Sequence, residues 1–205
     1  MDATYFFDPL CPHSWRTSRW LVEVAPARDV TIRWRSFSLP FLHEGAAAAQ
    51  YTDVADHYRA PAIASTRALR LVEWLSAAGD DDAIGRFYTE IGIRTHDAGV
   101  MIDDAIVLIA AERAGIAGAP AVLADESWDK AIRTSLRDAL ELAGPEIGAP
   151  VLHVQGAARG LYGPVIPGDM SAGEGLIVWD ATVALMRVNA FHELKRGRPG
   201  GDRRG

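Results

Sequence analysis

The sequence predicts a split α/β fold in which an all-helical insertion interrupts a small β-sheet. A strand–helix–strand unit opens the chain, no convincing strand occurs between residues 51 and 143, and two strands and a helix close it. At 205 residues, one domain or one domain with an insertion is the default. We therefore expect residues 1–40 and 145–205 to form one split α/β domain and residues 41–144 to form a helical insertion subdomain.

The opening unit contains a strand, a helix and a second strand. Thr4–Phe7 is β-branched and aromatic, as in a short buried strand. Pro12–Val24 has apolar residues at near-helical spacing, and we expect Pro26 and Asp29 to end this helix. Val30–Phe37 alternates in the manner of a strand. A strand–helix–strand unit implies parallel pairing of the strands with a right-handed crossover.

The middle of the chain is predicted to be helical. Ser38–Gln50 contains Pro40 and four consecutive alanines, and we expect a loop that leads into a helix. Gly and Pro residues and acidic helix starts divide the rest into five predicted helices. They are Ala62–Ala78, a helix that starts at Asp80–Asp82, Asp103–Ala114, Pro120–Leu123 and Ser127–Ala143.

The last part of the chain returns to strand character. Gly148–Gly156 reads as a strand that ends in a Gln155-Gly156 turn, and Leu161-Tyr162 is the expected returning arm of a hairpin. Ser171 and Glu174 have the spacing of a capping box at the start of a final helix, which we expect over Gly175–Leu194.

Composition excludes several classes of function. A net charge of −6 argues against a nucleic-acid-binding surface. No apolar run reaches the roughly 18 residues of a membrane span, and the start of the chain does not resemble a signal peptide. The single cysteine cannot form an internal disulfide. Together with the lack of a signal peptide and of a membrane span, this predicts a cytoplasmic protein. The histidines lack metal-ligand spacing, so we expect no metal.

Cys11 is the candidate catalytic residue. It follows a strand and precedes Pro12, a residue suited to the first position of a helix. There the free N–H groups of His13 and Ser14 and the helix dipole would favour the nucleophilic thiolate. The His13 imidazole, if it lies near the sulfur, would lower the pKa of the thiol further, although His13 is equally compatible with an exposed residue of the first helical turn. Against this interpretation, a lone cysteine is more commonly a small buried apolar residue.

Two neighbours of Cys11 admit two interpretations each. Ser14 could donate its hydroxyl to the thiolate, or it could be a passive residue of the first helical turn. Trp15 lies next to the motif, where a substrate pocket would form, but at its helical spacing it is more typical of the core.

Several motifs in the same order resemble a known family. Residues 11–14 (CPHS) resemble the Cys-Pro-x-Cys site of DsbA-like proteins of the thioredoxin superfamily, and Gly148–Pro150 resembles the cis-proline loop of that superfamily. Together with FFDPLCPHSW, GAPVLHVQG, YGPV and FHELKR, the chain is similar to the cytosolic mycothiol-dependent nitroreductase group.

The resemblance implies a thioredoxin-like fold (β-α-β … β-β-α) with a helical insertion that covers the thiol. It also implies that Pro150 is cis and that the Ala149 backbone docks a thiol substrate beside Cys11. Pro12 and Trp15 would line the same substrate site. No tightly bound cofactor is implied; a low-molecular-weight thiol, mycothiol or glutathione, would be the co-substrate.

Ser14 stands where this group has its second, resolving cysteine. A protein with one cysteine cannot expel its substrate by forming an internal disulfide, so an external thiol must resolve a mixed disulfide on Cys11. The sequence therefore predicts a monothiol mechanism. Ser14 is compatible with a natural serine and with an engineered replacement of cysteine, a change that traps mixed disulfides.

The leading hypothesis is a cytosolic thiol-dependent oxidoreductase that acts through Cys11 on a mixed disulfide or a small electrophile. A kappa-class glutathione transferase or isomerase-like enzyme is an alternative, although such enzymes use serine at the Cys11 position. A redox-silent binding or regulatory relative is a second alternative. A Cys11 pKa below about 7 would favour catalysis, and one near 8.5 the silent relative. The expected partners are small molecules, and a homodimer is compatible with the sequence.

Overall fold

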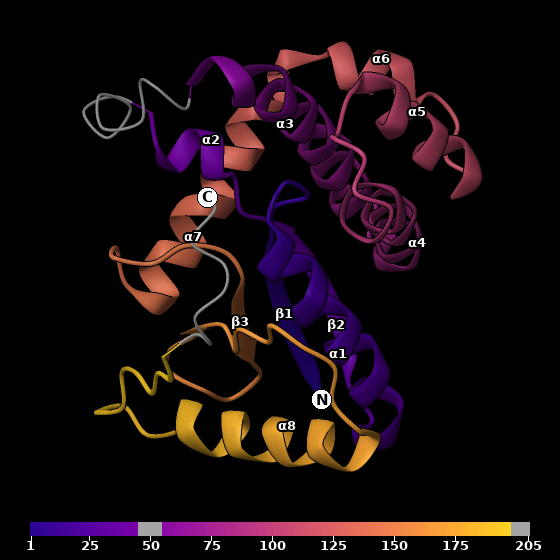
Figure 1. Ribbon diagram of the computed structural model, residues 1–205. Helices are drawn as coiled ribbons and strands as arrows, with labels where there is room; N and C mark the ends of the chain where they lie inside the picture. Colours follow the sequence, from indigo (N-terminus) through magenta and orange to yellow (C-terminus); the bar gives the residue numbers. More distant parts are fainter. Residues whose placement is uncertain (45–54, 198–205) are drawn as a thin grey trace.

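The computed structural model describes residues 1–44 and 55–197 and contains a four-stranded sheet in the order β2-β1-β3-β4 (Figure 1). Strand β1 (Asp2–Phe7) pairs in parallel with β2 (Thr31–Ser36). On its other side β1 pairs antiparallel with β3 (Val151–Val154), which forms a hairpin with β4 (Leu161–Tyr162). The predicted parallel pair and the predicted hairpin are both confirmed.

Between β2 and β3 the described residues form helices and no strand, as the sequence predicts. The first and last helices flank this region and contact each other near the bottom of Figure 1: α1 (Pro12–Arg28) and α8 (Ala172–Met186). The intervening helical elements are α2 (Leu39–Leu42), α3 (Ala55–Ala77), α4 (Asp81–Gly92), the π-helix η2 (Ile93–Asp97), α5 (Asp104–Arg113), α6 (Ala119–Ala124), the 3₁₀ turn η3 (Glu126–Trp128) and α7 (Asp129–Ala143).

Several predicted boundaries differ from the structure. Helix α1 continues past Pro26, the first predicted stop, and ends at Asp29, the second, whose left-handed backbone (φ 50°) and N–H bond to the Ala25 carbonyl terminate it. Helix α3 begins at Ala55 and passes through Pro61. The predicted loop Ser38–Gln50 contains α2, and residues 45–50 lie outside the described residues. The final helix begins at Ala172, directly after the predicted capping residue Ser171, rather than at Gly175. It ends at Met186 rather than at Leu194.

Strand β1 separates two hydrophobic clusters because its side chains alternate between the faces of the sheet. Tyr5 and Phe7 belong to the larger cluster, where both rings contact Trp34 edge to face and Phe7 stacks on Tyr88 at 4.0 Å. Phe6 belongs to the smaller cluster, which includes Cys11 and is covered by residues of α7. The alternation thus places the cysteine on the side of the sheet that α7 covers.

The helical region is attached to the sheet at its β2 edge. Strand β2 is an edge strand, so half of its backbone groups have no partner strand. Asp81 accepts the Trp34 N–H at 2.9 Å, and Glu73 accepts the Ser36 N–H at 3.3 Å. Two carboxylates from α3 and α4 therefore satisfy the edge and fix these helices relative to the strand.

The end of α4 packs directly on Trp15, the first large side chain after the CPHS motif. A Cβ atom added at Gly92 would lie 2.0 Å from Cε3 of the Trp15 ring, well inside contact distance. The indole in turn packs edge to face on Tyr88 and lies under the Arg19 guanidinium at 4.2 Å. Glycine at position 92 therefore allows α4 to approach the helix that carries Cys11.

We expect Gly92→Ala to lower the free energy of unfolding by about 2 kcal/mol or more, because the buried Trp15 ring must move. Urea unfolding followed by circular dichroism measures this change. Gly173→Ala is the matched control, since a Cβ at that exposed helical position meets nothing within 4 Å. An equal loss of stability in both variants would contradict this account of Gly92.

Candidate active site

Cys11 caps the N-terminus of α1. Its backbone is extended (φ −86°, ψ 114°), and Pro12 occupies the first helical position. The Cys11 N–H donates to the Asp8 carbonyl at 3.0 Å, which closes the turn between β1 and the helix. The Ser14 N–H donates to the Cys11 Sγ atom at 3.4 Å. The sulfur thus takes the place of the side-chain oxygen that usually caps a helix.

The loop before β3 lies against the thiol. The Ala149-Pro150 peptide is cis, and the Cys11 thiol donates to the Ala149 carbonyl oxygen with an S···O distance of 3.5 Å. Residues 138 positions apart in the sequence are therefore adjacent. The structure brings together Cys11, Ser14, Ala149 and Pro150, four of the predicted site residues.

Apolar side chains enclose Cys11, which is only 6% exposed. The surrounding cluster combines residues in or next to the strands with residues of α7, namely Phe6, Phe37, Leu136, Ala139, Ala149 and Val151. A nearly closed apolar environment protects the sulfur from water, and a substrate must displace part of this cover to reach it.

This environment raises the pKa of the Cys11 thiol above its ordinary value. Burial is the largest cause, because a thiolate loses its hydration. The Ser14 side chain and the N–H groups of Ser14 and His13 lower the pKa, whereas the negative charge of Asp8 raises it. The predicted lowered pKa is therefore wrong for this structure: the helix N-terminus acts as expected, but desolvation outweighs it.

The other predicted residues lie at different depths around the thiol. Pro12 is exposed and His13 is half buried. His13 influences the thiol through its backbone N–H, and a role for its imidazole stays a prediction. Trp15 is 3% exposed and its Nε1 donates to the Asp97 carboxylate at 2.7 Å, so this side chain belongs to the core rather than to an open pocket.

Sequence analysis missed two contributors to this site. Asp8 directly follows β1, and its carboxylate is fully buried next to the Cys11 turn. The π-helix η2 places His96 so that its Nε2 bonds the Pro9 carbonyl at 2.9 Å, and it places Asp97 on Trp15. The Asp-Pro pair was a usable signal for Asp8, whereas no local pattern marks a π-helix.

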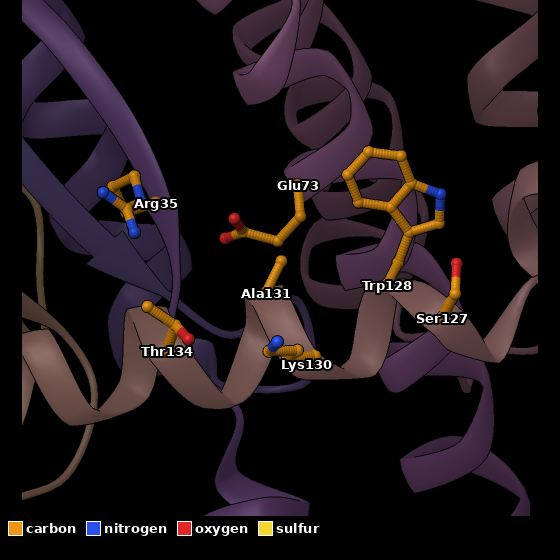
Figure 2. Close-up of a pocket in the computed structure, with 7 residues that line it drawn as sticks. All are labelled: Arg35, Glu73, Ser127, Trp128, Lys130, Ala131 and Thr134. Atoms are coloured by element: carbon orange, nitrogen blue, oxygen red, sulfur yellow. The ribbon is translucent and has the colours of Figure 1, made fainter.

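A separate hollow of about 430 Å³ lies between β2, α3 and α7. Figure 2 shows the Glu73 carboxylate pointing toward Arg35, with Ala131 and Thr134 of α7 beside them and Trp128 to one side. Glu73 is buried and accepts the Ser36 hydroxyl and N–H, and burial raises the pKa of its carboxyl. None of the residues that line this hollow belongs to the CPHS motif or the cis-proline loop.

Among the described residues, no group of three or more His, Cys, Asp or Glu side chains is arranged to hold a metal ion. Within the same residues, no helix has both the length and the apolar character required to cross a bilayer.

The fold and the site define a class of protein: a thioredoxin-like fold with a helical insertion, a cysteine at the first helix and a cis-proline loop beside it. The sequence profile of the family described as the mycothiol-dependent nitroreductase Rv2466c matches residues 10–196. The chain belongs to this family, which confirms the resemblance and the predicted thiol-dependent oxidoreductase class.

Individual proteins are similar to this chain over most of its length. The uncharacterized protein Rv2286c of Mycobacterium tuberculosis is 25% identical over 201 residues, which cover 97% of this chain and 83% of that protein. A probable DsbA oxidoreductase, SCO1869 of Streptomyces coelicolor, superposes with a TM-score of 0.56 at 19% identity and covers 90% of each chain. A periplasmic thioredoxin-like protein of Salmonella enterica serovar Typhimurium gives 0.55 at 18% identity, with 89% of this chain and 84% of that chain covered. These structures confirm the predicted thioredoxin-like fold.

We expect the rate of Cys11 alkylation by iodoacetamide to rise with pH up to a midpoint above the ordinary thiol pKa, because only the thiolate reacts and burial raises the pKa of Cys11. Intact-mass analysis between about pH 6 and pH 11 measures the profile, with the ordinary thiol pKa as the reference. A midpoint below about 7 would contradict the raised pKa and support the activated thiol that the sequence predicts.

We expect Ser14→Ala to move this midpoint to higher pH and to slow alkylation at pH 8 by about twofold to tenfold, because the Ser14 side chain stabilises the thiolate. Ser18→Ala, one turn further along α1, is the control, since the Ser18 hydroxyl donates to the Trp15 carbonyl instead. A profile unchanged by Ser14→Ala would leave Ser14 as a passive helical residue.

Proposed function

We propose that this protein is a monothiol oxidoreductase that exchanges a low-molecular-weight thiol with a mixed disulfide or a small electrophile through Cys11. The observation that carries the proposal is the contact of the Cys11 sulfur with both the Ser14 N–H and the Ala149 carbonyl of the cis-proline loop. This is the arrangement that a thiol–disulfide exchange site needs. A polarised helix terminus supports the nucleophile, and the Ala149 backbone beside it could pair with a substrate that displaces the thiol from its carbonyl.

The exchange proceeds in two steps. In the first, the Cys11 thiolate attacks one sulfur of a disulfide R–S–S–R′, a Cys11–S–S–R bond forms, and R′–S⁻ leaves and takes up a proton. In the second, the thiolate of another small molecule attacks the R sulfur, which forms R–S–S–R″ and releases the Cys11 thiolate. Ser14 cannot perform this second attack, because a hydroxyl does not reduce a disulfide.

Mycothiol is the co-substrate that the family assignment favours, with glutathione as the alternative. Mycothiol is an intracellular reductant, so the protein would act in the cytoplasm. The helical insertion, residues 41–144, would form the cover of the substrate site, because Leu136 and Ala139 of α7 belong to the same buried apolar cluster as Cys11.

One observation favours a second candidate function. The Cys11 thiol is nearly buried and its pKa is raised, which is the state expected of a redox-silent binding or regulatory relative. The enzyme is supported instead by the position of Cys11, whose sulfur contacts both the Ser14 N–H and the Ala149 carbonyl of the cis-proline loop.

Incubation with mycothiol disulfide and, separately, with glutathione disulfide distinguishes the two functions by intact mass. We expect one adduct on Cys11, removed by the matching thiol, with mycothiol disulfide as the better donor. Cys11→Ser is the control and should take up none. The absence of an adduct with either disulfide at pH 9 would favour the redox-silent relative.

We expect Ser14→Cys to convert the site into a two-cysteine switch. The second thiol would expel the bound half of the substrate, so the adduct would give way to an internal disulfide two mass units (about 2 Da) below the reduced protein. The same incubation followed over time measures this change. A stable adduct in Ser14→Cys would show that position 14 does not reach the mixed disulfide.

A further inference from the structure

Asp8 is a fully buried carboxylate at the turn between β1 and the Cys11 helix. All three groups that contact its oxygens donate hydrogen bonds. The Leu10 N–H and the Ser65 hydroxyl donate to Oδ1 at 2.8 and 2.5 Å, and the Leu39 N–H donates to Oδ2 at 2.7 Å. Backbone N–H groups can only donate, so the Leu10 and Leu39 contacts suit the ionised carboxylate. The three hydrogen bonds lower the pKa of Asp8, but burial is the larger effect and raises it overall.

Two of these three donors come from outside the strand–turn–helix unit. Ser65 lies on α3, and Leu39 is the first residue of α2, so both belong to the chain between β2 and β3. The third donor, the Leu10 N–H, belongs to the turn itself. Asp8 is thus a direct link between the helical region and the turn that positions Cys11.

The same carboxylate acts on the thiol. Its charge raises the pKa of Cys11 and so opposes the Ser14 and His13 groups that lower it. Tyr5 of β1 and Tyr88 of α4 also interact electrostatically with Cys11, but burial raises the pKa of both phenols well above 10.0, so they stay neutral. Asp8 is therefore the negative charge that opposes ionisation of the sulfur.

We propose that Asp8 is a positioning residue through which the helical insertion controls Cys11: when α3 donates to Asp8, the carboxylate stays charged and the thiol stays protonated. This inference rests on Cys11 being the working thiol of the proposed function. Movement of α3 away from Asp8 removes a donor. The buried carboxylate then takes up a proton, its charge disappears and the thiolate becomes more favourable.

The pH profile of Cys11 alkylation in Asp8→Asn tests the proposal. Asparagine keeps an oxygen for Leu10 and Ser65 but removes the charge. We expect the midpoint to move to lower pH and the rate at pH 7 to rise about threefold or more. Asp169→Asn, in an exposed loop, is the charge-matched control and should leave the profile unchanged. A midpoint unchanged or raised in folded Asp8→Asn overturns the proposal.

Ser65→Ala tests the link to the insertion and remains decisive if Asp8→Asn does not fold. Loss of this donor should raise the rate at pH 7 in the same direction but to a smaller extent, with the circular dichroism spectrum preserved. An unchanged Ser65→Ala profile overturns the link to α3. The readout is separate from the proposed function, because a failure to form adducts with disulfides leaves the iodoacetamide profile measurable.

Discussion

The contact between the Cys11 sulfur and the Ala149 carbonyl joins the first and last parts of the chain at one point. It depends on β1 and β3 lying side by side, because β1 leads into the Cys11 turn and the cis-proline loop leads into β3. The Ser14 N–H on the other side of the sulfur depends on α1 beginning at Pro12. The thiol therefore has its two polar neighbours only because of three features: the order of the strands, the start of α1 at Pro12 and the geometry of the cis-proline loop.

Two opposing effects decide the state of this thiol. The helix N-terminus and Ser14 stabilise the thiolate, whereas apolar side chains from the sheet and α7 remove water from it, and Asp8 adds a negative charge nearby. Desolvation is the larger effect in the free protein. A resting thiol that is protonated and covered is protected from unwanted oxidation, and its reactivity then depends on how far a substrate opens the cover.

Local patterns in the sequence predicted the sheet and the helices, because strand alternation, Pro12 and the capping box at Ser171 each act over a few residues. The proximity of Cys11 to the Ala149-Pro150 loop was implied by the family resemblance, since no local pattern joins residues so far apart in the sequence. The end of α8 and the extension of α1 past Pro26 depend on tertiary packing and were missed. The sign of the Cys11 pKa shift was also missed, since it depends on α7 side chains more than a hundred residues away in the sequence. Asp8 was overlooked because its donors are distant in sequence.

The central claim is that Cys11 works with external thiols alone. The most direct measurement is the rate at which the preformed Cys11 mixed disulfide is discharged, followed by stopped-flow mass analysis across a series of mycothiol concentrations. The account predicts a rate proportional to thiol concentration that extrapolates to zero without thiol, because no group of this chain can resolve the disulfide. A discharge rate that stays finite at zero thiol would contradict it.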